Sequence, residues 1–326
     1  MNSINVENRK TLMLFSGRGY PELAAEIGAE LGVEPTPTEA YDFPDGQVFV
    51  RYQESVRGSD AFVVQSMTDP INKWLVESLI MVDALKRGSA KRITVVVPYY
   101  PYARQDKKHR GREPISARLV ADLYRTAGAN RILTVDLHTA QIQGFFDGPV
   151  DHLFAMDVLA GYVERSYAGR PMTVVAPDSG RVRVAERWTD RLGGLPLAFI
   201  HKTRDPLKPG HIVANRVVGE VEGRVCLIVD DIIDTGATIV RAAEIVRAAG
   251  AADVIVAATH PVLSDPATER LKNSMVSEIV VTNTLPIPSE KRLDKITVLS
   301  IAPLVARAIH EVFADGSVTT LFGGLS

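Results

Sequence analysis

Three carboxylates and a turn of small residues lie close together near position 234. Asp230 and Asp231 end a hydrophobic run, and Asp234 opens a turn into an expected helix through Thr235, Gly236, Ala237 and Thr238. Backbone N–H groups at a helix start, together with Thr hydroxyls, can hold a phosphate group. The two upstream carboxylates suit a sugar diol or a hydrated magnesium ion. Helix capping explains Asp234 or Thr235 but not two further acids at a strand end, so we favour a binding site.

Two other segments place charged or aromatic residues after expected strands. Residues 98–108 mix tyrosines with cations, and Arg104 and Gln105 suit an adenine ring and a polyphosphate. Taken alone, this segment is better explained as a basic surface loop. Asp136 and His138 end another strand and share one of its faces, because side chains alternate along a strand. They offer two kinds of metal ligand, although a single histidine at a strand end is more often structural.

Two further loops supply a carboxylate and a pair of cations. Asp178 lies in a Pro-Asp-Ser-Gly sequence at the end of a third strand, where the glycine allows a flexible turn. Lys202 and Arg204 come just before segment 205–210, which is rich in proline, glycine and lysine. We interpret that segment as a mobile lid.

The strands and helices expected around these residues alternate in a regular order. Strands are expected at 12–15, 48–53, 61–65, 92–97, 131–137, 173–176, 197–200, 225–229, 254–258, 278–281 and 297–300. Helices are expected at 21–31, 71–87, 116–127, 182–192, 238–249 and 303–313. This alternation predicts an α/β fold with βαβ units and largely parallel sheets. In open α/β sheets the carboxyl ends of the strands face the ligand crevice, where the polar residues named above would meet.

A weak internal repeat favours two similar halves. Residues 127–138 resemble residues 249–260, since in both a helix ends at Ala-Gly-Ala, a strand follows, and a histidine stands at its far end. Any joint of helix, glycine and strand has a similar pattern, so duplication and coincidence are equally supported. The length of 326 residues also suggests about two domains. We expect domains at 1–153 and 154–326, with the tail after about 314 packing back on the first.

Composition narrows the class of protein. Lys and Arg number 37 and Asp and Glu 39, a net charge of −2, which argues against bulk electrostatic binding of nucleic acid or a membrane surface. The single cysteine, Cys226, allows no intramolecular disulfide and is best explained as a small buried hydrophobe. The apolar runs are too short to span a bilayer, and residues 1–10 are polar. We expect a cytoplasmic protein.

The acidic segment resembles the ribose-phosphate signature of the type I phosphoribosyltransferase fold. Segments 54–58, 79–86, 102–108, 112–116, 136–138, 141–147, 177–180, 230–238, 259–264 and 281–284 together are similar to the class I ribose-phosphate diphosphokinase (PRPP synthetase) family over nearly the whole chain. The resemblance implies two similar domains of type I phosphoribosyltransferase-like fold, each a mainly parallel sheet flanked by helices. It places ATP and subunit contacts on the first domain and ribose 5-phosphate on the second.

The resemblance also implies a reaction. The family transfers the diphosphoryl group of ATP to the 1-hydroxyl of ribose 5-phosphate, giving 5-phosphoribosyl 1-diphosphate (PRPP) and AMP for nucleotide, histidine and tryptophan biosynthesis. Such transfers depend mainly on positioning and charge neutralisation. Mg²⁺ is the implied cofactor, with His138 and Asp178 as its matched residues. Lys202 and Arg204 match the catalytic cations placed on the transferring phosphates.

The remaining matches concern the two substrates and the assembly. ATP-binding residues are implied at Arg104 and Gln105, and in a loop contributed by a neighbouring subunit at Phe43, Asp45 and Gln47. Ribose 5-phosphate is implied to contact Asp230, Asp231, Asp234, Thr235, Gly236, Ala237 and Thr238. The family forms homo-oligomers, typically hexamers built from dimers. A regulatory site for phosphate, an activator, and ADP, an inhibitor, is implied at Ser55, Arg57, Gln143, Ser317, Val318 and Phe322.

Three positions depart from the family's pattern. Gln47 stands where the adenine loop usually has Glu, so it can donate and accept a hydrogen bond but carries no charge. Arg181 replaces the second glycine of the diphosphate loop, and either points away or adds a cation near the phosphates. Ala237 replaces a common glycine and would hinder a positive φ.

Other functions use the same fold. A phosphoribosyltransferase would need a hood for a nucleobase but not the ATP segment. A non-catalytic associated subunit or a PRPP-sensing regulator would keep the fold and lose catalytic residues. Here Lys202, Arg204, His138, Asp178 and the acidic segment all persist, which favours the enzyme.

Overall fold

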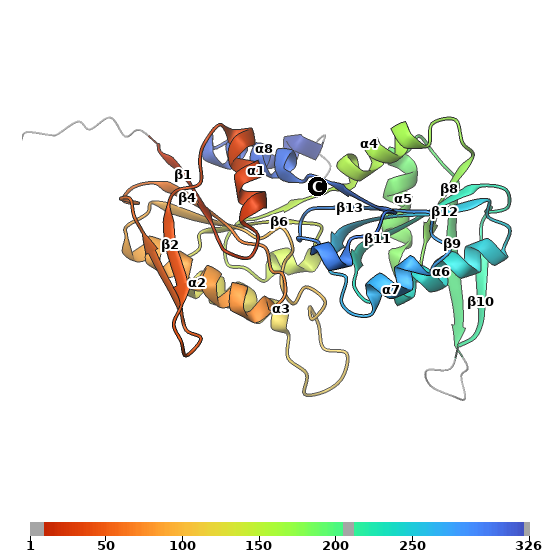
Figure 1. The fold of residues 1–326 in the computed structure, drawn as a ribbon, viewed down its shortest axis with the longest axis horizontal. Coiled ribbons are helices and arrows are strands. Elements are labelled where there is room, and N and C mark those ends of the chain that lie inside the picture. The colour runs from red at the N-terminus through yellow and green to blue at the C-terminus, as the bar shows by residue number, and fades with distance from the viewer. Residues whose placement is uncertain (1–9, 205–211, 323–326) are drawn as a thin grey trace, which may run out of the picture. The chain divides into compact units, whose positions relative to one another are not determined.

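The computed structural model describes residues 10–204 and 212–322. Within these, the chain divides into two compact units (Figure 1). The first holds the described residues up to Leu153 together with those from Ala302 onward, and the second holds those between Phe154 and Ile301. The last helix therefore belongs with the first unit.

The first unit is built on a parallel sheet in the order β1-β4-β5-β6-β7. Its strands are β1 (Leu12–Ser16), β4 (Asp60–Val64), β5 (Arg92–Val96), β6 (Arg131–Val135) and β7 (Val150–Leu153). Helices α1 (Pro21–Leu31) and α8 (Ala302–Phe313) cover one face (Figure 1). Helices α2 (Ile71–Arg87) and α3 (Ser116–Ala127) cover the other, with short 3-10 turns at Ala140–Gly144 and Val318–Phe322.

The core of this sheet follows from its composition. Strands β4, β5 and β6 are buried along nearly their whole length because helices cover both faces, as parallel sheets require. On the side of α2 and α3 the core contains, among others, Phe15, Val63, Val95, Met81, Leu85, Val120 and Tyr124. The sheet is therefore a rigid base for the loops at its ends.

The second unit has a seven-stranded sheet in the order β10-β9-β8-β11-β12-β13-β14. Its strands are β8 (Met172–Ala176), β9 (Leu197–Arg204), β10 (Ile212–Val218), β11 (Val225–Ile233), β12 (Asp253–Pro261), β13 (Glu278–Thr282) and β14 (Ile296–Leu299). All pairs are parallel except β9 with β10. The two mainly parallel sheets with flanking helices confirm the predicted α/β fold class.

Four helices flank this second sheet. They are α4 (Met156–Ser166), α5 (Val182–Arg191), α6 (Ala237–Ala248) and α7 (Ala267–Lys272), with 3-10 turns at Ser179–Arg181 and Ser289–Lys291. In Figure 1, α4 and α5 lie on one side of the sheet, and α6 and α7 on the other. Cys226 is fully buried on β11, and burial raises its pKa to about 11, which confirms the interpretation as a packing residue.

Several elements were not expected from the sequence. They are β2 (Thr38–Asp42), β7, α4, β10 and α7. Strands β9, β11 and β12 also continue beyond their predicted ends. The longer β11 places Asp230 and Asp231 inside a strand rather than after it. Among the described residues, none of the helices is both long and apolar enough to cross a membrane.

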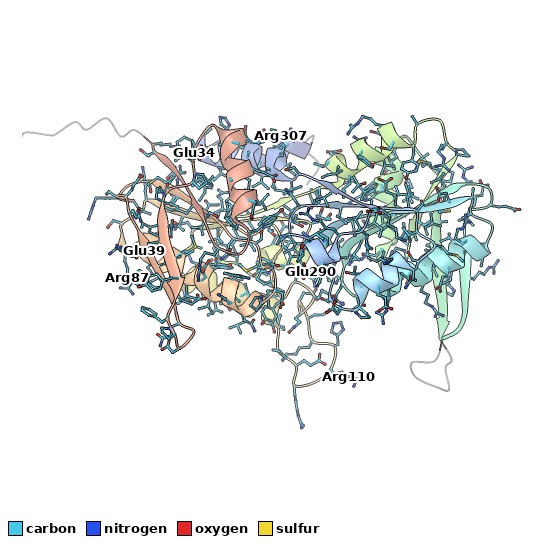
Figure 2. All side chains as sticks on the ribbon, in the orientation of Figure 1. Glu34, Glu39, Arg87, Arg110, Glu290 and Arg307 are labelled. Carbon is cyan, nitrogen blue, oxygen red and sulfur yellow. The ribbon has the colours of Figure 1, made fainter. Side chains whose placement is uncertain are left out.

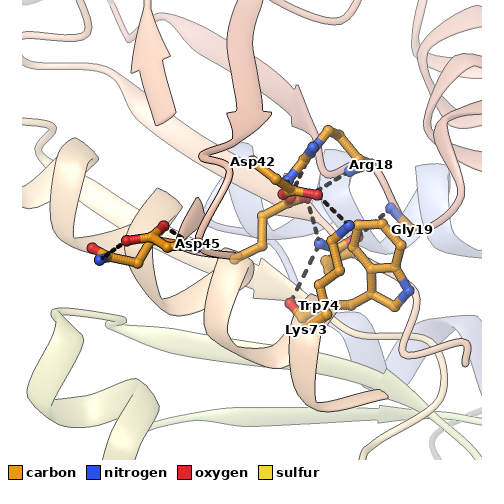
Figure 3. A network of polar contacts seen from close by, with 9 residues as sticks. Arg18, Gly19, Asp42, Asp45, Lys73 and Trp74 are labelled. Atoms are coloured by element: carbon orange, nitrogen blue, oxygen red, sulfur yellow. Dashed lines mark hydrogen bonds and ion pairs between the residues drawn. The ribbon is translucent and has the colours of Figure 1, made fainter. Parts of the chain in front are cut away.

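A two-stranded hairpin stands apart from the first sheet. It pairs β2 with β3 (Val48–Tyr52) in antiparallel register. At its end, Asp42 accepts hydrogen bonds from Arg18 Nη2 and Lys73 Nζ, both at 2.6 Å (Figure 3). These two bonds lower the pKa of the Asp42 carboxyl, and the bond from Lys73 has the larger effect. The hairpin is thereby tied to the loop after β1 and to α2.

Glu77 on α2 holds Arg18, the residue that binds Asp42, in place. Its side chain has no exposed surface, and its two oxygens accept from the Arg18 amide at 2.8 Å and from Arg18 Nε at 2.6 Å. Gln65 Nε2 donates to it as well at 3.0 Å, while Gln65 Oε1 accepts from the Gly19 amide. The buried carboxylate therefore has its partners, as a charge inside a protein needs.

Glu77→Leu is expected to lower the free energy of unfolding by about 3 kcal/mol, because it leaves the Arg18 guanidinium and amide without their buried partner. Chemical denaturation of the purified protein measures the change. Arg87→Gln on the same helix is the control, since that side chain is 78% exposed (Figure 2). An unfolding midpoint for Glu77→Leu equal to that of the control would contradict the role assigned to this network.

Candidate functional site

The acidic segment forms a strand end, a turn and a helix start in the second unit. Asp230 and Asp231 lie on β11, and Gly236 has φ +72° as the residue before α6. The first bond of the helix runs from the Val240 amide to the Gly236 carbonyl at 3.0 Å. The earlier amides of α6 have no carbonyl within the helix to pair with, and Gly236, the residue before the helix, has no side chain that could cap them. This arrangement suits a phosphate group.

Residues of helix α7 contact the turn that precedes α6. Arg270 Nη1 donates to the Thr235 carbonyl at 3.1 Å. A Cβ on Gly236 would lie 3.3 Å from Leu271 Cγ, so both the backbone angle and the neighbouring helix require glycine here. Ala237 has no positive φ, because the left-handed residue is Gly236. The substitution of alanine at 237 is therefore compatible with the turn.

A cavity opens beside the first turn of α6. It has a volume of about 180 Å³ and is lined by Pro177, Ile200, Ala237, Thr238, Arg241, Ala242 and Ile245. Two of its lining residues, Ala237 and Thr238, belong to the predicted phosphate turn. Pro177 begins the predicted diphosphate loop, so the two loops border the same space.

The diphosphate loop contacts the acidic pair directly. Asp178 accepts a hydrogen bond from the Gly180 amide at 2.9 Å and starts a short 3-10 turn over Ser179–Arg181. Arg181 Nε lies 3.0 Å from Asp230 Oδ1, and its Nη2 lies 2.5 Å from Asp231 Oδ1. Arg181 thus points toward the acids rather than away from the site.

The electrostatics of this cluster follow from burial. Burial and the charge of Asp231 raise the pKa of Asp230 above its ordinary value, while the Arg181 guanidinium opposes the rise. Burial lowers the pKa of Arg181, but the charges of Asp231, Asp230 and Asp178 raise it overall. The guanidinium is therefore charged at any physiological pH.

The predicted catalytic cations lie on an edge hairpin of the same sheet. Lys202 and Arg204 belong to β9, where Lys202 is opposite Asn215 and Arg204 is opposite Ile212 of β10. Strand β9 pairs with β8, the strand that leads into the diphosphate loop. The lid predicted at 205–210 lies outside the described residues.

The predicted ATP segment forms a long loop between β5 and α3 in the first unit. Arg104 and Gln105 are exposed, and farther along the loop Arg110 extends away from the sheet (Figure 2). Gln105 accepts a hydrogen bond from Ser116 Oγ at 2.7 Å, which ties it to the start of α3. Tyr102 adopts a left-handed φ of 59°. Strained backbone of this kind persists only where the surroundings hold it.

Asp106 joins this loop to the segment that carries His138. It is almost fully buried, at 4% exposure, and accepts hydrogen bonds from Thr139 Oγ1 at 2.8 Å and Gln141 Nε2 at 2.6 Å. His152 Nε2 accepts from the Leu137 amide at 2.8 Å, which shows that this ring nitrogen carries no proton. No role for Asp106 or His152 is predictable from the sequence, because nothing along the chain indicates their partners.

Asp136 and His138 are half-buried at the end of β6. Asp136 has a left-handed φ of 39°, which an aspartate adopts more readily than most residues. His138 belongs to the first unit, whereas Asp178 belongs to the second. Among residues 10–204 and 212–322, no three His, Cys, Asp or Glu side chains gather into a metal site.

The predicted adenine loop forms the tip of the β2–β3 hairpin. Phe43 is 41% exposed, and its ring packs edge-on against Tyr41 at 5.4 Å between centroids. Gln47 Nε2 donates to Asp45 Oδ2 at 2.6 Å, so these two side chains orient each other (Figure 3). An amide can make this bond where two carboxylates would repel each other.

The predicted regulatory residues come from separate segments of the first unit. Ser55 and Arg57 are exposed between β3 and β4, and Gln143 lies in the 3-10 turn Ala140–Gly144 near His152. Ser317 precedes the 3-10 turn Val318–Phe322, which packs on α8. Ser317 Oγ lies 2.7 Å from Thr319 Oγ1.

Gly236→Ala is expected to weaken the binding of a phosphate ester by about tenfold, because the left-handed conformation and the contact with Leu271 both disfavour a Cβ. Titration calorimetry measures the affinity. Ala237→Gly, one residue farther on, should keep the affinity of the unmodified protein. Equal affinities for both variants would show that this turn does not hold the phosphate.

Comparison with known proteins supplies independent findings. A family model described as the N-terminal domain of ribose phosphate pyrophosphokinase matches residues 12–128, and one described as the phosphoribosyl synthetase-associated domain matches residues 205–323. Curated proteins called ribose-phosphate pyrophosphokinase are 64% identical in Mycobacterium leprae and in Streptomyces coelicolor. The first match covers 98% of this chain and 97% of that protein, and the second covers 99% of each.

A solved structure is similar to this chain in both sequence and fold. The crystal structure of phosphoribosylpyrophosphate synthetase from Mycobacterium smegmatis has 62% sequence identity to this chain and a TM-score of 0.90. It covers 94% of this chain and 100% of its own. The likeness therefore extends over both compact units.

Proposed function

The chain belongs to the ribose-phosphate pyrophosphokinase family, and from this premise we propose how its residues carry out the family's reaction. The protein is a transferase that moves the diphosphoryl group of ATP to the 1-hydroxyl of ribose 5-phosphate, which yields PRPP and AMP. The observation that carries this assignment is identity of 59% to 64% to relatives of that name over 98% or more of the chain. The family's acidic segment, His138, Asp178, Lys202 and Arg204 are all present, which supports an enzyme rather than a non-catalytic relative.

The second unit is proposed to bind ribose 5-phosphate. The α6 amides and the Thr235 and Thr238 hydroxyls would hold the 5-phosphate, and Asp230 and Asp231 would accept hydrogen bonds from the ribose hydroxyls. The left-handed Gly236 and the backbone amides at the start of α6 support this arrangement. Binding through fixed groups holds the 1-hydroxyl in place, and positioning is the main requirement of such a transfer.

ATP is proposed to bind mainly at the first unit. Arg104 and Gln105 would contact the nucleotide, and Phe43, Asp45 and Gln47 would contact adenine from a neighbouring subunit. The exposure of Phe43 at the tip of an anchored hairpin supports that contact, since an aromatic ring there can stack on a base. Lys202 and Arg204 would neutralise charge on the transferring phosphates.

Magnesium is proposed to accompany ATP. His138 and Asp178 would hold it together with substrate oxygens, because Mg²⁺ is usually bound by one or two carboxylates plus phosphates rather than by a protein cage. The donor set fits this mode, since one imidazole and one carboxylate leave the remaining coordination positions to substrate oxygens and water. When bound, the ion would supply charge neutralisation on the phosphates.

Assembly, regulation and location are further parts of the proposal. We propose a homohexamer built from dimers, because the adenine loop would act on a neighbouring subunit. Ser55, Arg57, Gln143, Ser317, Val318 and Phe322 would form a site where phosphate activates and ADP inhibits. The buried thiol of Cys226 and the absence of any second cysteine support a cytoplasmic location.

Incubation of the full chain with MgATP and ribose 5-phosphate is expected to release one AMP for each PRPP formed, because the attack is on the β-phosphorus. Phosphorus NMR and nucleotide chromatography measure both products. Release of ADP would indicate ordinary phosphoryl transfer instead. Formation of a nucleotide from PRPP and a nucleobase would indicate a phosphoribosyltransferase, and no turnover at all would indicate the non-catalytic alternative.

Two variants test the assignment within this assay. Lys202→Ala should lower kcat by about a hundredfold or more, because a cation on the transferring phosphates is lost. Arg216→Gln is the matched control, since this exposed cation on β10 faces His201 rather than Lys202. Near-normal turnover of Lys202→Ala would refute the role assigned to Lys202. Both variants should have the same circular dichroism spectrum as the unmodified protein, which shows that they are folded.

Inorganic phosphate is expected to raise the rate, and ADP is expected to inhibit in a manner that is not purely competitive with ATP, because both would bind away from the ATP site. Initial rates at varied ATP with and without each effector measure this. Rates independent of phosphate, with purely competitive inhibition by ADP, would remove the regulatory part of the proposal and leave the reaction untouched.

A further inference from the structure

Arg181 is a half-buried cation that bridges two adjacent acids. Its side chain is 17% exposed, and those of Asp230 and Asp231 are 12% and 10% exposed. Nε lies 3.0 Å from Asp230 Oδ1, and Nη2 lies 2.5 Å from Asp231 Oδ1. These two nitrogens occupy one edge of the planar guanidinium, so a single group contacts both carboxylates side by side.

The turn that presents Arg181 is itself held in place. Asp178 Oδ1 accepts from the Gly180 amide at 2.9 Å, and the Arg181 amide donates to the Asp178 carbonyl at 3.2 Å. A Cβ on Gly180 would lie 3.2 Å from Asp178 Oδ1, closer than most Cβ contacts. Helix α5 begins at the next residue, Val182. The guanidinium is therefore directed by a fixed turn rather than by a flexible loop.

The acids on the other side are equally constrained. Asp230 Oδ1 accepts a hydrogen bond from the Asp231 amide at 2.9 Å and forms an ion pair with Arg181 Nε at 3.0 Å. Two neighbouring carboxylates with little exposure repel each other, and removing the charge between them leaves uncompensated buried charge. The guanidinium between them offsets one of the two negative charges and limits how either carboxylate can rotate.

We propose that Arg181 is a positioning residue that acts as a built-in counter-ion: it holds Asp230 and Asp231 as oriented acceptors for the ribose hydroxyls and keeps the pair from binding a free divalent cation. This inference rests on the proposed binding of ribose 5-phosphate at the acidic segment. The divalent cation would then stay with the ATP phosphates, because the guanidinium already offsets part of the negative charge that would attract it to the carboxylate pair in the empty enzyme.

Arginine is suited to this task and lysine is not. A lysine ammonium at position 181 would supply the same charge, but as a point with three rotatable donors rather than as a planar fork. Lysine should therefore exclude a free cation while orienting the acids less well. Glutamine has neither the charge nor the fork, so it should fail at both.

The experiment compares Arg181→Gln and Arg181→Lys with the unmodified chain. Arg183→Gln is the matched control, because Arg183 is an exposed cation two residues away at the start of α5. Free and bound Mn²⁺ are measured by electron paramagnetic resonance in the absence of nucleotide, and KM and kcat are measured for both substrates.

Arg181→Gln should raise KM for ribose 5-phosphate by about tenfold while changing KM for ATP less, because hydrogen bonds to oriented charged groups are lost. It should also gain about one Mn²⁺ per chain that the unmodified enzyme does not bind without nucleotide. Arg181→Lys should gain no Mn²⁺ but should show part of the rise in KM. Arg183→Gln should match the unmodified chain in all four measurements.

Unchanged KM for ribose 5-phosphate and unchanged Mn²⁺ binding in folded Arg181→Gln would overturn the inference. If that variant does not fold, Arg181→Lys tests the inference instead. A KM for ribose 5-phosphate equal to that of the unmodified chain would show that the planar guanidinium does not orient Asp230 and Asp231. The proposed function is judged separately by whether the unmodified chain makes PRPP, and Mn²⁺ binding without nucleotide does not depend on that result.

Discussion

The parallel pairing of β8 with β11 is the constraint on which the second unit's site depends. Met172 to Val175 stand opposite Val225 to Ile228, so the two strands run in step toward the same edge. The turn after β8 must then lie beside the acids that continue β11. Because both strands are fully buried where they pair, neither can shift without exposing apolar surface.

The burial of the paired strands also determines where charged side chains lie. The sheets exclude charge from their interiors, so polar side chains gather at strand ends and at the supporting turns. In the second unit this brings two carboxylates and one guanidinium together, and in the first it surrounds the carboxylate of Glu77 with donors. The net charge of −2 for the whole chain gives no sign of these local concentrations of charge. Each charged side chain in them has a partner of opposite charge or a hydrogen-bond donor, which its removal from water requires.

Much of the fold was predictable because long periodic elements carry their own signal. Helices α2 and α3 occur at the predicted residues, and the buried strands differ by only a few. The missed elements are short or depend on a neighbour: β2 is polar and pairs only with β3, and α7 has six residues. Their sequences lack a periodic pattern long enough to identify them, and tertiary packing decides whether they form.

The order of amino acids specifies which chemical groups are available and which of them are close along the chain. The phosphate turn at Gly236 is local, since a few consecutive residues set its backbone angles and its helix start. Arg181 and Asp106 meet their partners through the folding of distant segments, since those partners are 50 and 33 residues away along the chain. Contacts across that distance depend on strand order and register, and no short segment of sequence encodes either.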